Sequence, residues 1–153
     1  MIKIFEFLYP KAIILELQSK DKKGAVSELV ECVMKEKKLK DSNKAIASVM
    51  EREKLGTTGI GQGVAIPHGR TDAVSDLVGA VGISRQGVEF EALDGEPVHI
   101  IFLLLSPPDS GGQHLRALAK VSRLCKDKFF RQALLESKSK EEVLKIIQQE
   151  DEL

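Results

Sequence analysis

The most apolar stretch of the chain is PVHIIFLLLS, residues 97–106, and it limits the folds that this sequence can adopt. Its apolar residues follow one another without regular polar alternation, which is typical of a strand covered on both faces. Asp94–Gly95 marks a turn before the run, and Pro107–Pro108 ends it. We therefore expect a central strand at 97–106, buried between two layers.

Shorter segments predict the rest of the sheet. A buried strand is expected at 12–17, after a break at Pro10, and a short one at 64–67. Two more are expected at 78–84 and 88–92, joined by a turn at 85–87.

Helical spacing predicts the covering layers. Asp21 can cap a first helix, whose apolar residues recur at intervals of three and four, and Ser42 can cap a second that ends near Leu55–Gly56. A third helix opens after Pro108 with His114 in its first turn, a short one covers 128–137, and a last one starts near Lys140 with a capping box. The apolar faces are Val26, Leu29, Val30, Val33 and Met34 in the first helix; Ile46, Val49 and Met50 in the second; and Leu115, Leu118 and Cys125 in the third. Strands mixed with helices predict one α/β (α+β) domain over residues 1–153, with helices on both faces of the sheet.

Composition narrows the possible functions. Of 153 residues, 42% are hydrophobic and 30% charged, and 23 Lys and Arg balance 23 Asp and Glu. No net charge favours nucleic acid or an anionic membrane, so function must reside in a local site. Cys32 and Cys125 lack the spacing of a zinc site or disulfide framework, and charges interrupt the apolar N-terminus before it reaches the length of a signal peptide or membrane span. We expect a cytoplasmic protein with reduced thiols, no direct membrane insertion, no cofactor and no metal.

The glycine-rich stretch GTTGIGQGVAIPHGR, residues 56–70, is the candidate site. No GK[ST] follows its glycines, and the third glycine of GxGxxG is replaced by Val64, so neither nucleotide-binding motif is present. What remains is a loop whose backbone can approach a ligand and which leads into a strand end that presents His68. Imidazole there could act as an acid/base group or as a nucleophile, and a turn histidine bonded to the backbone is an equally good interpretation.

A phosphoryl group on a ring nitrogen would need positive partners. One cation about 4 Å away contributes roughly 4 kcal/mol at an effective dielectric constant near 20. The candidates are Arg52, Arg70 and His114, the last at a helix start, where backbone amides favour anions. Considered alone, the two arginines are better interpreted as solvated surface charges, and His114 as an ordinary residue at a helix start. His99, inside the apolar run, is better interpreted as structural.

Two stretches together resemble a known family. These are GTTGIGQGVAIPHGR and GVEFEALDGEPVHIIFLLLSPPDSGGQHLRALAKVSRLC, and the chain is similar over nearly its whole length to enzyme IIA of the phosphoenolpyruvate-dependent phosphotransferase system (PTS), in the fructose/mannitol/nitrogen-regulatory (type 2) class. The resemblance implies a mixed β-sheet flanked by helices. It also implies that His68 accepts a phosphoryl group from the phosphohistidine of the small carrier protein HPr, or of its nitrogen-branch counterpart. His114 would then hydrogen-bond the phosphoryl oxygens, and Arg52 would help to neutralise them.

With that role, we expect the Nδ1–H of His68 to be held by a backbone carbonyl, which leaves Nε2 as an in-line nucleophile. The hydroxyl groups of Thr57–Thr58 would serve the loop or the phosphoryl oxygens. Ile60, Val64 and Ile66 could form an apolar rim for the partner, with buried strand positions as the alternative.

The class contains two kinds of protein. Nitrogen-type regulators bind target proteins according to their phosphorylation state, and sugar-transport proteins pass the phosphoryl group to a IIB domain. The loop resembles the nitrogen type, and the 153 residues include no IIB or IIC segment, which favours the regulator. A degenerate domain that binds partners without accepting phosphate is disfavoured, because Arg52, His68 and His114 are all present.

Overall fold

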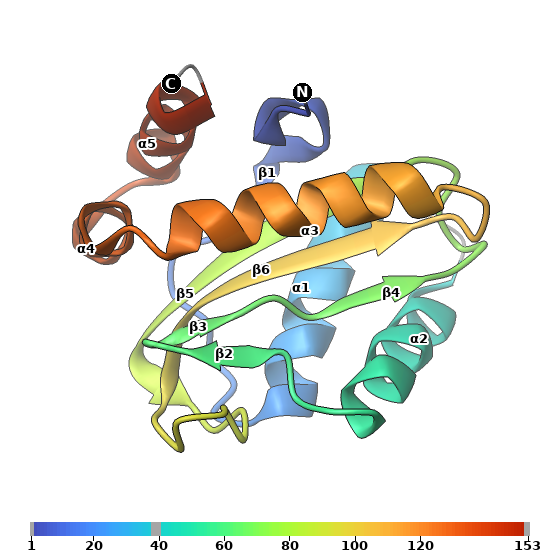
Figure 1. The fold of residues 1–153 in the computed structure, drawn as a ribbon, viewed down its shortest axis with the longest axis horizontal. Helices are drawn as coiled ribbons and strands as arrows, with labels where there is room; N and C mark the ends of the chain where they lie inside the picture. The colour runs from blue at the N-terminus through green and yellow to red at the C-terminus, as the bar shows by residue number, and fades with distance from the viewer. Residues whose placement is uncertain (1, 38–40, 152–153) are drawn as a thin grey trace.

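The computed structural model describes residues 2–37 and 41–151, and strand β6 (Val98–Ser106) lies at the centre of its sheet, as predicted (Figure 1). Strand β6 pairs antiparallel with β5 and parallel with β3 and β4. Its apolar side chains alternate between two buried clusters, one on each face of the sheet. Burial on both faces explains why this segment is uniformly apolar.

The sheet has the order β1-β5-β6-β3-β2. Strand β4 also pairs with β6, on the same edge as β3 but nearer the C-terminal end of β6. Because β1 runs parallel to β5 while β5 runs antiparallel to β6, the sheet is mixed. The remaining strands are β1 (Leu8–Ile14), β2 (Gly59–Gly61), β3 (Val64–Ala65), β4 (His68–Arg70) and β5 (Val78–Val88).

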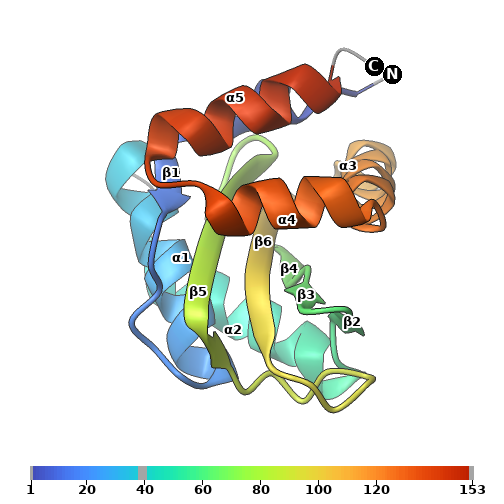
Figure 2. The same cartoon turned by 90° about the vertical axis from the view of Figure 1, so that its left-hand side faces the viewer.

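Helices cover both faces, and the predicted fold class is confirmed. One face carries α1 and α2, and the other carries α3, α4 and α5 (Figure 2). The bounds are η1 (Ile4–Glu6), α1 (Lys22–Lys37), α2 (Ser42–Lys54), α3 (Gly111–Cys125), α4 (Lys128–Glu136) and α5 (Lys140–Asp151). Within the described ranges, no helix combines the length and hydropathy that a membrane crossing requires.

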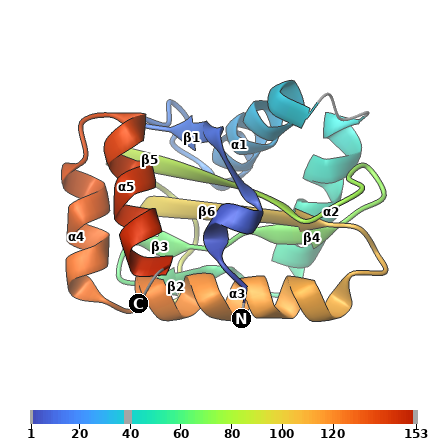
Figure 3. The ribbon, with the colours of Figure 1, turned by 90° about the horizontal axis from the view of Figure 1, so that it is seen from above.

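The two ends of the described chain meet beside α3. The carboxylate of Asp151, at the end of α5, accepts hydrogen bonds from the backbone N–H groups of Ile4 and Phe5 in η1. Lys120 of α3 lies 3.7 Å from the same carboxylate, and both side chains are buried. Seen from above, η1 lies between α5 and α3 (Figure 3), so this contact ties three segments together.

Two strand predictions were wrong, and both involve bulges. Strand β1 covers Leu8–Ile14 rather than the predicted 12–17, and it runs through Pro10. Among the described strands it pairs only with β5, and the missing N–H of a proline is tolerated in an edge strand. Its register is irregular between Leu8 and Ile13. The predicted turn at 85–87 is instead a bulge inside β5, where Gly87 has φ +92°, so the predicted strands 78–84 and 88–92 are replaced by one strand that ends at Val88.

Helix starts were predicted more closely than helix faces. Asp21 caps α1 and accepts from the N–H of Gly24, as predicted, but α2 is capped by Asp41 rather than Ser42. In α3 the predicted inner residue Leu115 is 62% exposed, and the inner face instead begins one residue earlier, at His114.

Candidate functional site

The register of the sheet sets the direction of two side chains in the glycine-rich loop. His68 lies beside Leu104 and Arg70 beside Ser106 in the parallel pairing of β4 with β6. Registered neighbours point to the same side of a sheet, and Leu104 belongs to the core under α3. His68 and Arg70 therefore face α3. The intervening Gly69 faces α2, where a Cβ would meet backbone atoms.

His114 reaches the same place from α3. The chain reverses after β6, and α3 then runs back over the strand (Figure 1). His114 is 3% exposed and shares the inner face of α3 with Ala117 and Val121. The centroids of the His68 and His114 rings are 5.3 Å apart, and the ring planes are tilted by 59°.

Both imidazoles are held at Nδ1 from the inside of the protein. Nδ1 of His68 lies 2.9 Å from the carbonyl oxygen of Ile66, and Nδ1 of His114 lies 2.5 Å from Oγ of Ser106. A carbonyl can only accept, so His68 carries its proton on Nδ1, and the predicted backbone contact is confirmed. Neither Nε2 has a protein partner among the described residues. Since no buried side-chain nitrogen or oxygen there lacks a partner, both Nε2 atoms reach solvent.

The electrostatic environment keeps both rings neutral. Burial lowers the pKa of His68, the Ile66 carbonyl opposes that shift, and the positive charge of Arg52 lowers it further. Burial, then the neighbouring His68 and Arg70, lowers the pKa of His114 to about 4. At neutral pH the imidazoles are therefore uncharged.

The two arginines differ in how they are held. The Arg70 guanidinium lies over the start of α3, where a Cβ on Gly111 would be 3.1 Å from it. Arg52, near the end of α2, donates to the carbonyl of Gly56 over 2.9 Å, and it lines the same hollow as His68. Both guanidinium groups thus lie near His68, and Arg70 also acts on His114, whereas the isolated sequence reading favoured solvated surface charges.

A buried carboxylate that the sequence reading missed supports the loop. Glu53 is 7% exposed, accepts from the N–H and hydroxyl of Thr58, and lies 3.1 Å from the ammonium of Lys22. The hydroxyl of Thr57 donates to the carbonyl of Phe90. Both threonine hydroxyls therefore serve the loop, which was one of the two predicted uses. A glutamate beside an arginine near a helix end gives no sequence signal of burial.

The mouth of the site is partly apolar. A hollow of about 210 Å³ opens beside His68, and Ile60, 41% exposed, and Leu118 line it. Leu115 is more exposed still, on the first turns of α3. Of the predicted rim residues only Ile60 is exposed, while Val64 and Ile66 are buried strand or loop positions. The rim is therefore shared between the glycine-rich loop and α3.

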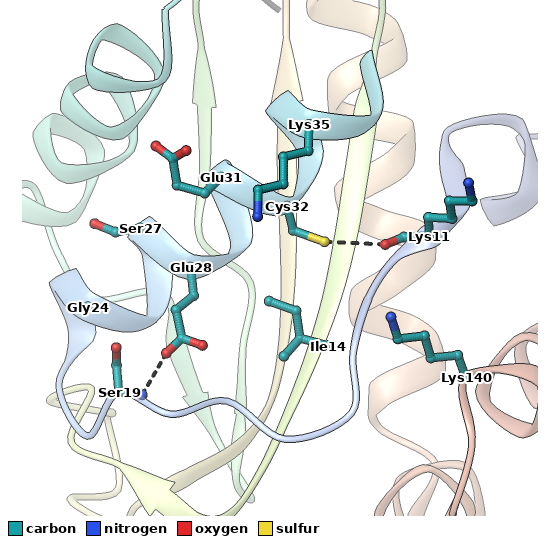
Figure 4. Close-up of a pocket in the computed structure, with 10 residues that line it drawn as sticks. All are labelled: Lys11, Ile14, Ser19, Gly24, Ser27, Glu28, Glu31, Cys32, Lys35 and Lys140. Atoms are coloured by element: carbon teal, nitrogen blue, oxygen red, sulfur yellow. Dashed lines mark hydrogen bonds between the residues drawn. The ribbon is translucent and has the colours of Figure 1, made fainter. Parts of the chain in front are cut away.

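Another hollow lies elsewhere, between α1 and β1, with a volume of about 710 Å³ (Figure 4). In it Glu28 accepts from the backbone N–H of Ser19, and the Cys32 thiol contacts the carbonyl of Lys11. Its lining includes Lys11, Lys35, Lys140, Glu28 and Glu31, and none of its lining residues lines the hollow at His68. Within the described part of the chain, no group of His, Cys, Asp or Glu is arranged to hold a metal.

Two further polar residues of β6 differ in their relation to the two rings: His99 bonds elsewhere, and Ser106 contacts His114. His99 donates through Nδ1–H to the carbonyl oxygen of Ser84 over 2.7 Å, which is the structural role expected for it. Ser106 was not predicted. Its only sequence signal is a polar residue closing an apolar strand, which is equally common where a strand simply ends.

Two imidazoles thus lie beside two guanidinium groups on a mixed α/β sheet, an arrangement with the chemistry to bind an anion. Comparison with known proteins identifies the class. Residues 6–150 match the family model described as "Phosphoenolpyruvate-dependent sugar phosphotransferase system, EIIA 2". The chain belongs to this family, whose members take part in phosphoryl transfer.

Individual relatives fall into both functional branches. The fructose-specific EIIABC component of Bacillus subtilis is 37% identical over 150 residues, which is 98% of this chain but only 24% of that protein. A nitrogen regulatory protein of Bradyrhizobium diazoefficiens is 36% identical, with 94% of each chain covered. The crystal structure of the nitrogen regulatory protein IIA-Ntr from Neisseria meningitidis superposes with a TM-score of 0.87 at 39% identity, covering 94% of this chain and 98% of that one.

Proposed function

We propose that this protein is a cytoplasmic phosphoryl carrier that accepts a phosphoryl group on Nε2 of His68 from the phosphohistidine of an HPr-like carrier. The observation that carries the proposal is the pairing of two imidazoles at 5.3 Å, each held at Nδ1 from within and open at Nε2. Family membership supports the reaction class. IIA proteins of this family exchange phosphoryl groups with carrier and IIB partners.

The transfer balances without a further reactant. The Nε2 lone pair of His68 attacks phosphorus as the bond from phosphorus to the donor imidazole breaks, and the bonding pair stays on the donor nitrogen. The bond that forms is of the same type as the bond that breaks, so the protein's part is to align the groups and to stabilise charge. Arg52 and Arg70 would offset the phosphoryl charge, and His114 would hydrogen-bond an oxygen.

The exposed apolar residues around the hollow give a docking surface for the donor. Ile60 lines the hollow from the glycine-rich loop, Leu118 lines it from α3, and Leu115 is exposed on the first turns of the same helix. Exposed apolar groups rimmed by charges are typical of protein interfaces. The partner's active-site loop would cover the hollow and exclude water during transfer.

Between the two branches, the regulatory one is the better supported. The IIA-Ntr structure from Neisseria meningitidis superposes with a TM-score of 0.87 at 39% identity, and 94% of the Bradyrhizobium regulator is covered, although 88% of a fructose-specific EIIA component of Haloferax volcanii is covered as well. The transport alternative stays open, because the fructose-specific relative is equally similar over the part that aligns. In that case His68 would pass its phosphoryl group to a fructose or mannitol IIB domain.

The test is phosphorylation of the purified protein with phosphoenolpyruvate, enzyme I and an HPr-like carrier. We expect one acid-labile phosphoryl group, absent from His68→Ala. His99→Ala is the matched control, since His99 also has Nδ1 against a backbone carbonyl on the same sheet, at 2.7 Å, and should leave labelling intact. An unlabelled wild type beside a labelled reference carrier would overturn the proposal.

Onward transfer separates the branches. The phosphorylated protein is mixed with purified fructose and mannitol IIB domains, and loss of the label from His68 is followed. Rapid transfer would identify a transport component. Retention of the label with every IIB domain would support the regulator.

A further inference from the structure

The side chain of Ser106, the last residue of β6, makes its hydrogen bond to His114 and is completely buried. The strand's alternation directs Leu104 and then Ser106 toward α3, which places the hydroxyl under the first turns of that helix. The distance from Oγ to Nδ1 is 2.5 Å, a short contact between buried groups. Neither the family match nor the reading of the motif assigns a role to this residue.

A neutral imidazole has one N–H, so a bond at one nitrogen decides what the other nitrogen offers. If the Ser106 hydroxyl donates to Nδ1, the proton of His114 lies on Nε2, and the ring presents a donor to the site. If Nδ1–H donates to Oγ, then Nε2 presents a lone pair. The two arrangements have opposite consequences for an anion.

The surroundings favour the first arrangement. Among the described residues, Nδ1 of His114 is the only partner of the Ser106 hydroxyl. In the second arrangement the buried hydroxyl proton would have no acceptor, which costs about 1–3 kcal/mol. In the first arrangement the hydroxyl proton is used, and Nε2–H, which reaches solvent, is satisfied by water.

The neighbouring ring adds a second argument. His68 must carry its proton on Nδ1, because the Ile66 carbonyl can only accept, so its Nε2 presents a lone pair. With its Nδ1 engaged by Ser106, His114 would present a donor beside that lone pair. With the opposite tautomer of His114, the two rings would both present a nitrogen lone pair to the same site, because their centroids are 5.3 Å apart.

We propose that Ser106 is a positioning residue that fixes His114 as its Nε2–H tautomer, so that a neutral imidazole donates a hydrogen bond to the phosphoryl group. The catalytic consequence rests on the proposed function of His68, whereas the tautomer does not. Because the ring need not gain a proton, the contact is in place before the donor arrives, and no reorganisation is needed during transfer. The low pKa of His114, about 4, agrees with a ring that works uncharged.

The first experiment reads the tautomer directly in the unphosphorylated protein. Long-range 1H–15N correlation spectra of the 15N-histidine-labelled chain at neutral pH distinguish protonated from unprotonated ring nitrogens. We expect protonated Nε2 and unprotonated Nδ1 for His114, and the reverse for His68. In Ser106→Ala the His114 signals should shift toward a mixture of tautomers, and Ser106→Thr, which keeps the hydroxyl, should retain the wild-type pattern.

The second experiment measures transfer. We expect Ser106→Ala to slow phosphorylation of His68 about tenfold, the effect of losing one well-placed hydrogen bond. In a His114→Ala background, removing the Ser106 hydroxyl should cause no further loss, because the hydroxyl acts through that ring. Ser84→Ala is the matched control, since Ser84 is also a fully buried serine of the sheet, and it should leave rate and tautomer unchanged.

The outcomes are separable. Finding His114 protonated on Nδ1 in the wild type, or an unchanged tautomer and rate in Ser106→Ala, would overturn the role of Ser106. If Ser106→Ala slows transfer equally in the wild type and in the His114→Ala background, Ser106 acts through packing and not through the His114 ring, and the proposal is overturned. If the wild type accepts no phosphoryl group, the proposed function fails, but the tautomer measurement still decides the assignment for Ser106.

Discussion

Acidification should destabilise this protein through His114. Burial and the nearby His68 and Arg70 lower the pKa of His114 from 6.5 to about 4. In the unfolded chain the ring binds a proton below its ordinary pKa, whereas the folded ring resists protonation until the pH approaches the lower value. The unfolded state therefore binds more protons between the two values, and the free energy of unfolding falls as the pH falls through that window. Above it, the contribution is fully present.

The size of the effect follows from the shift. At about 1.36 kcal/mol per pKa unit, it amounts to roughly 3 kcal/mol. That is a large share of the roughly 5–15 kcal/mol by which domains are stable. His114 is 3% exposed, so solvent screening reduces this figure little.

Urea denaturation at several pH values between about 7 and 4 tests the prediction, comparing wild type with His114→Gln. Glutamine keeps an amide that can bond Ser106 but does not titrate. Carboxylates and His68 titrate in both proteins, so the difference between the two unfolding free energies isolates His114. We expect the wild type to lose about 3 kcal/mol relative to the variant over this range. Parallel pH profiles for the two proteins would refute the reasoning.

Two further substitutions test the supports of the site. Gly69→Ala would place a Cβ 3.0 Å from a backbone nitrogen of α2, so it should cost about 1–3 kcal/mol in thermal or urea unfolding and also slow phosphorylation of the adjacent histidine. Gly95→Ala, which meets no atom within 4 Å but has φ +73°, should cost about 1 kcal/mol and leave phosphorylation unchanged, and equal effects in both assays would contradict the steric argument. Lys22→Met should cost about 3 kcal/mol in urea unfolding, because it leaves the Glu53 carboxylate, whose side chain is 3% exposed, without its cation. Lys44→Ala, which breaks a pair exposed to solvent, should leave stability unchanged, and similar losses from both lysines would show that burial does not matter here.

The parts of the fold that the sequence predicted are those that local patterning determines. The run at 97–106 was assigned to the centre of the sheet because a strand covered on both faces cannot alternate. The face of α1 followed from spacing, and Val26, Leu29 and Val33 are all buried. In both cases the pattern itself is the consequence of burial.

The errors arise where one local signal fits two structures. A glycine with positive φ suits a hairpin turn and a bulge equally, and only the pairing of Ile83 with Ile100 and Val88 with Val98 shows that β5 continues. The face of α3 is misplaced because the prediction follows the apolar residues Leu115, Leu118 and Cys125, whereas the buried face begins at the polar residue His114. Its buried Nδ1 has its partner in Ser106, which is eight residues away and belongs to another element.

Candidate site residues were found through the motif, but their arrangement was not. His68 and His114 were chosen individually, and their proximity comes from the register of β4 on β6 and the return of α3 over that strand. Glu53 and Ser106 were missed because each is recognisable only by its partner in space. Buried polar groups are hydrogen-bonded in pairs, and a sequence shows one member at a time.

The arrangement of charge explains how one site could both accept and release a phosphoryl group. Burial is the main cause of the lowered pKa of His68, and the positive charges of Arg52 and Arg70 lower that pKa further, which helps to keep the ring unprotonated. A protonated ring would have no lone pair at Nε2 and could not attack phosphorus, so the same field that attracts a dianion also preserves the nucleophile. Had the positive charge been on the imidazoles, each transfer would have required a proton to leave first. With the positive charge on guanidinium groups rather than on the rings, charge stabilisation would be separate from proton movement, and the proposed transfer could run in either direction.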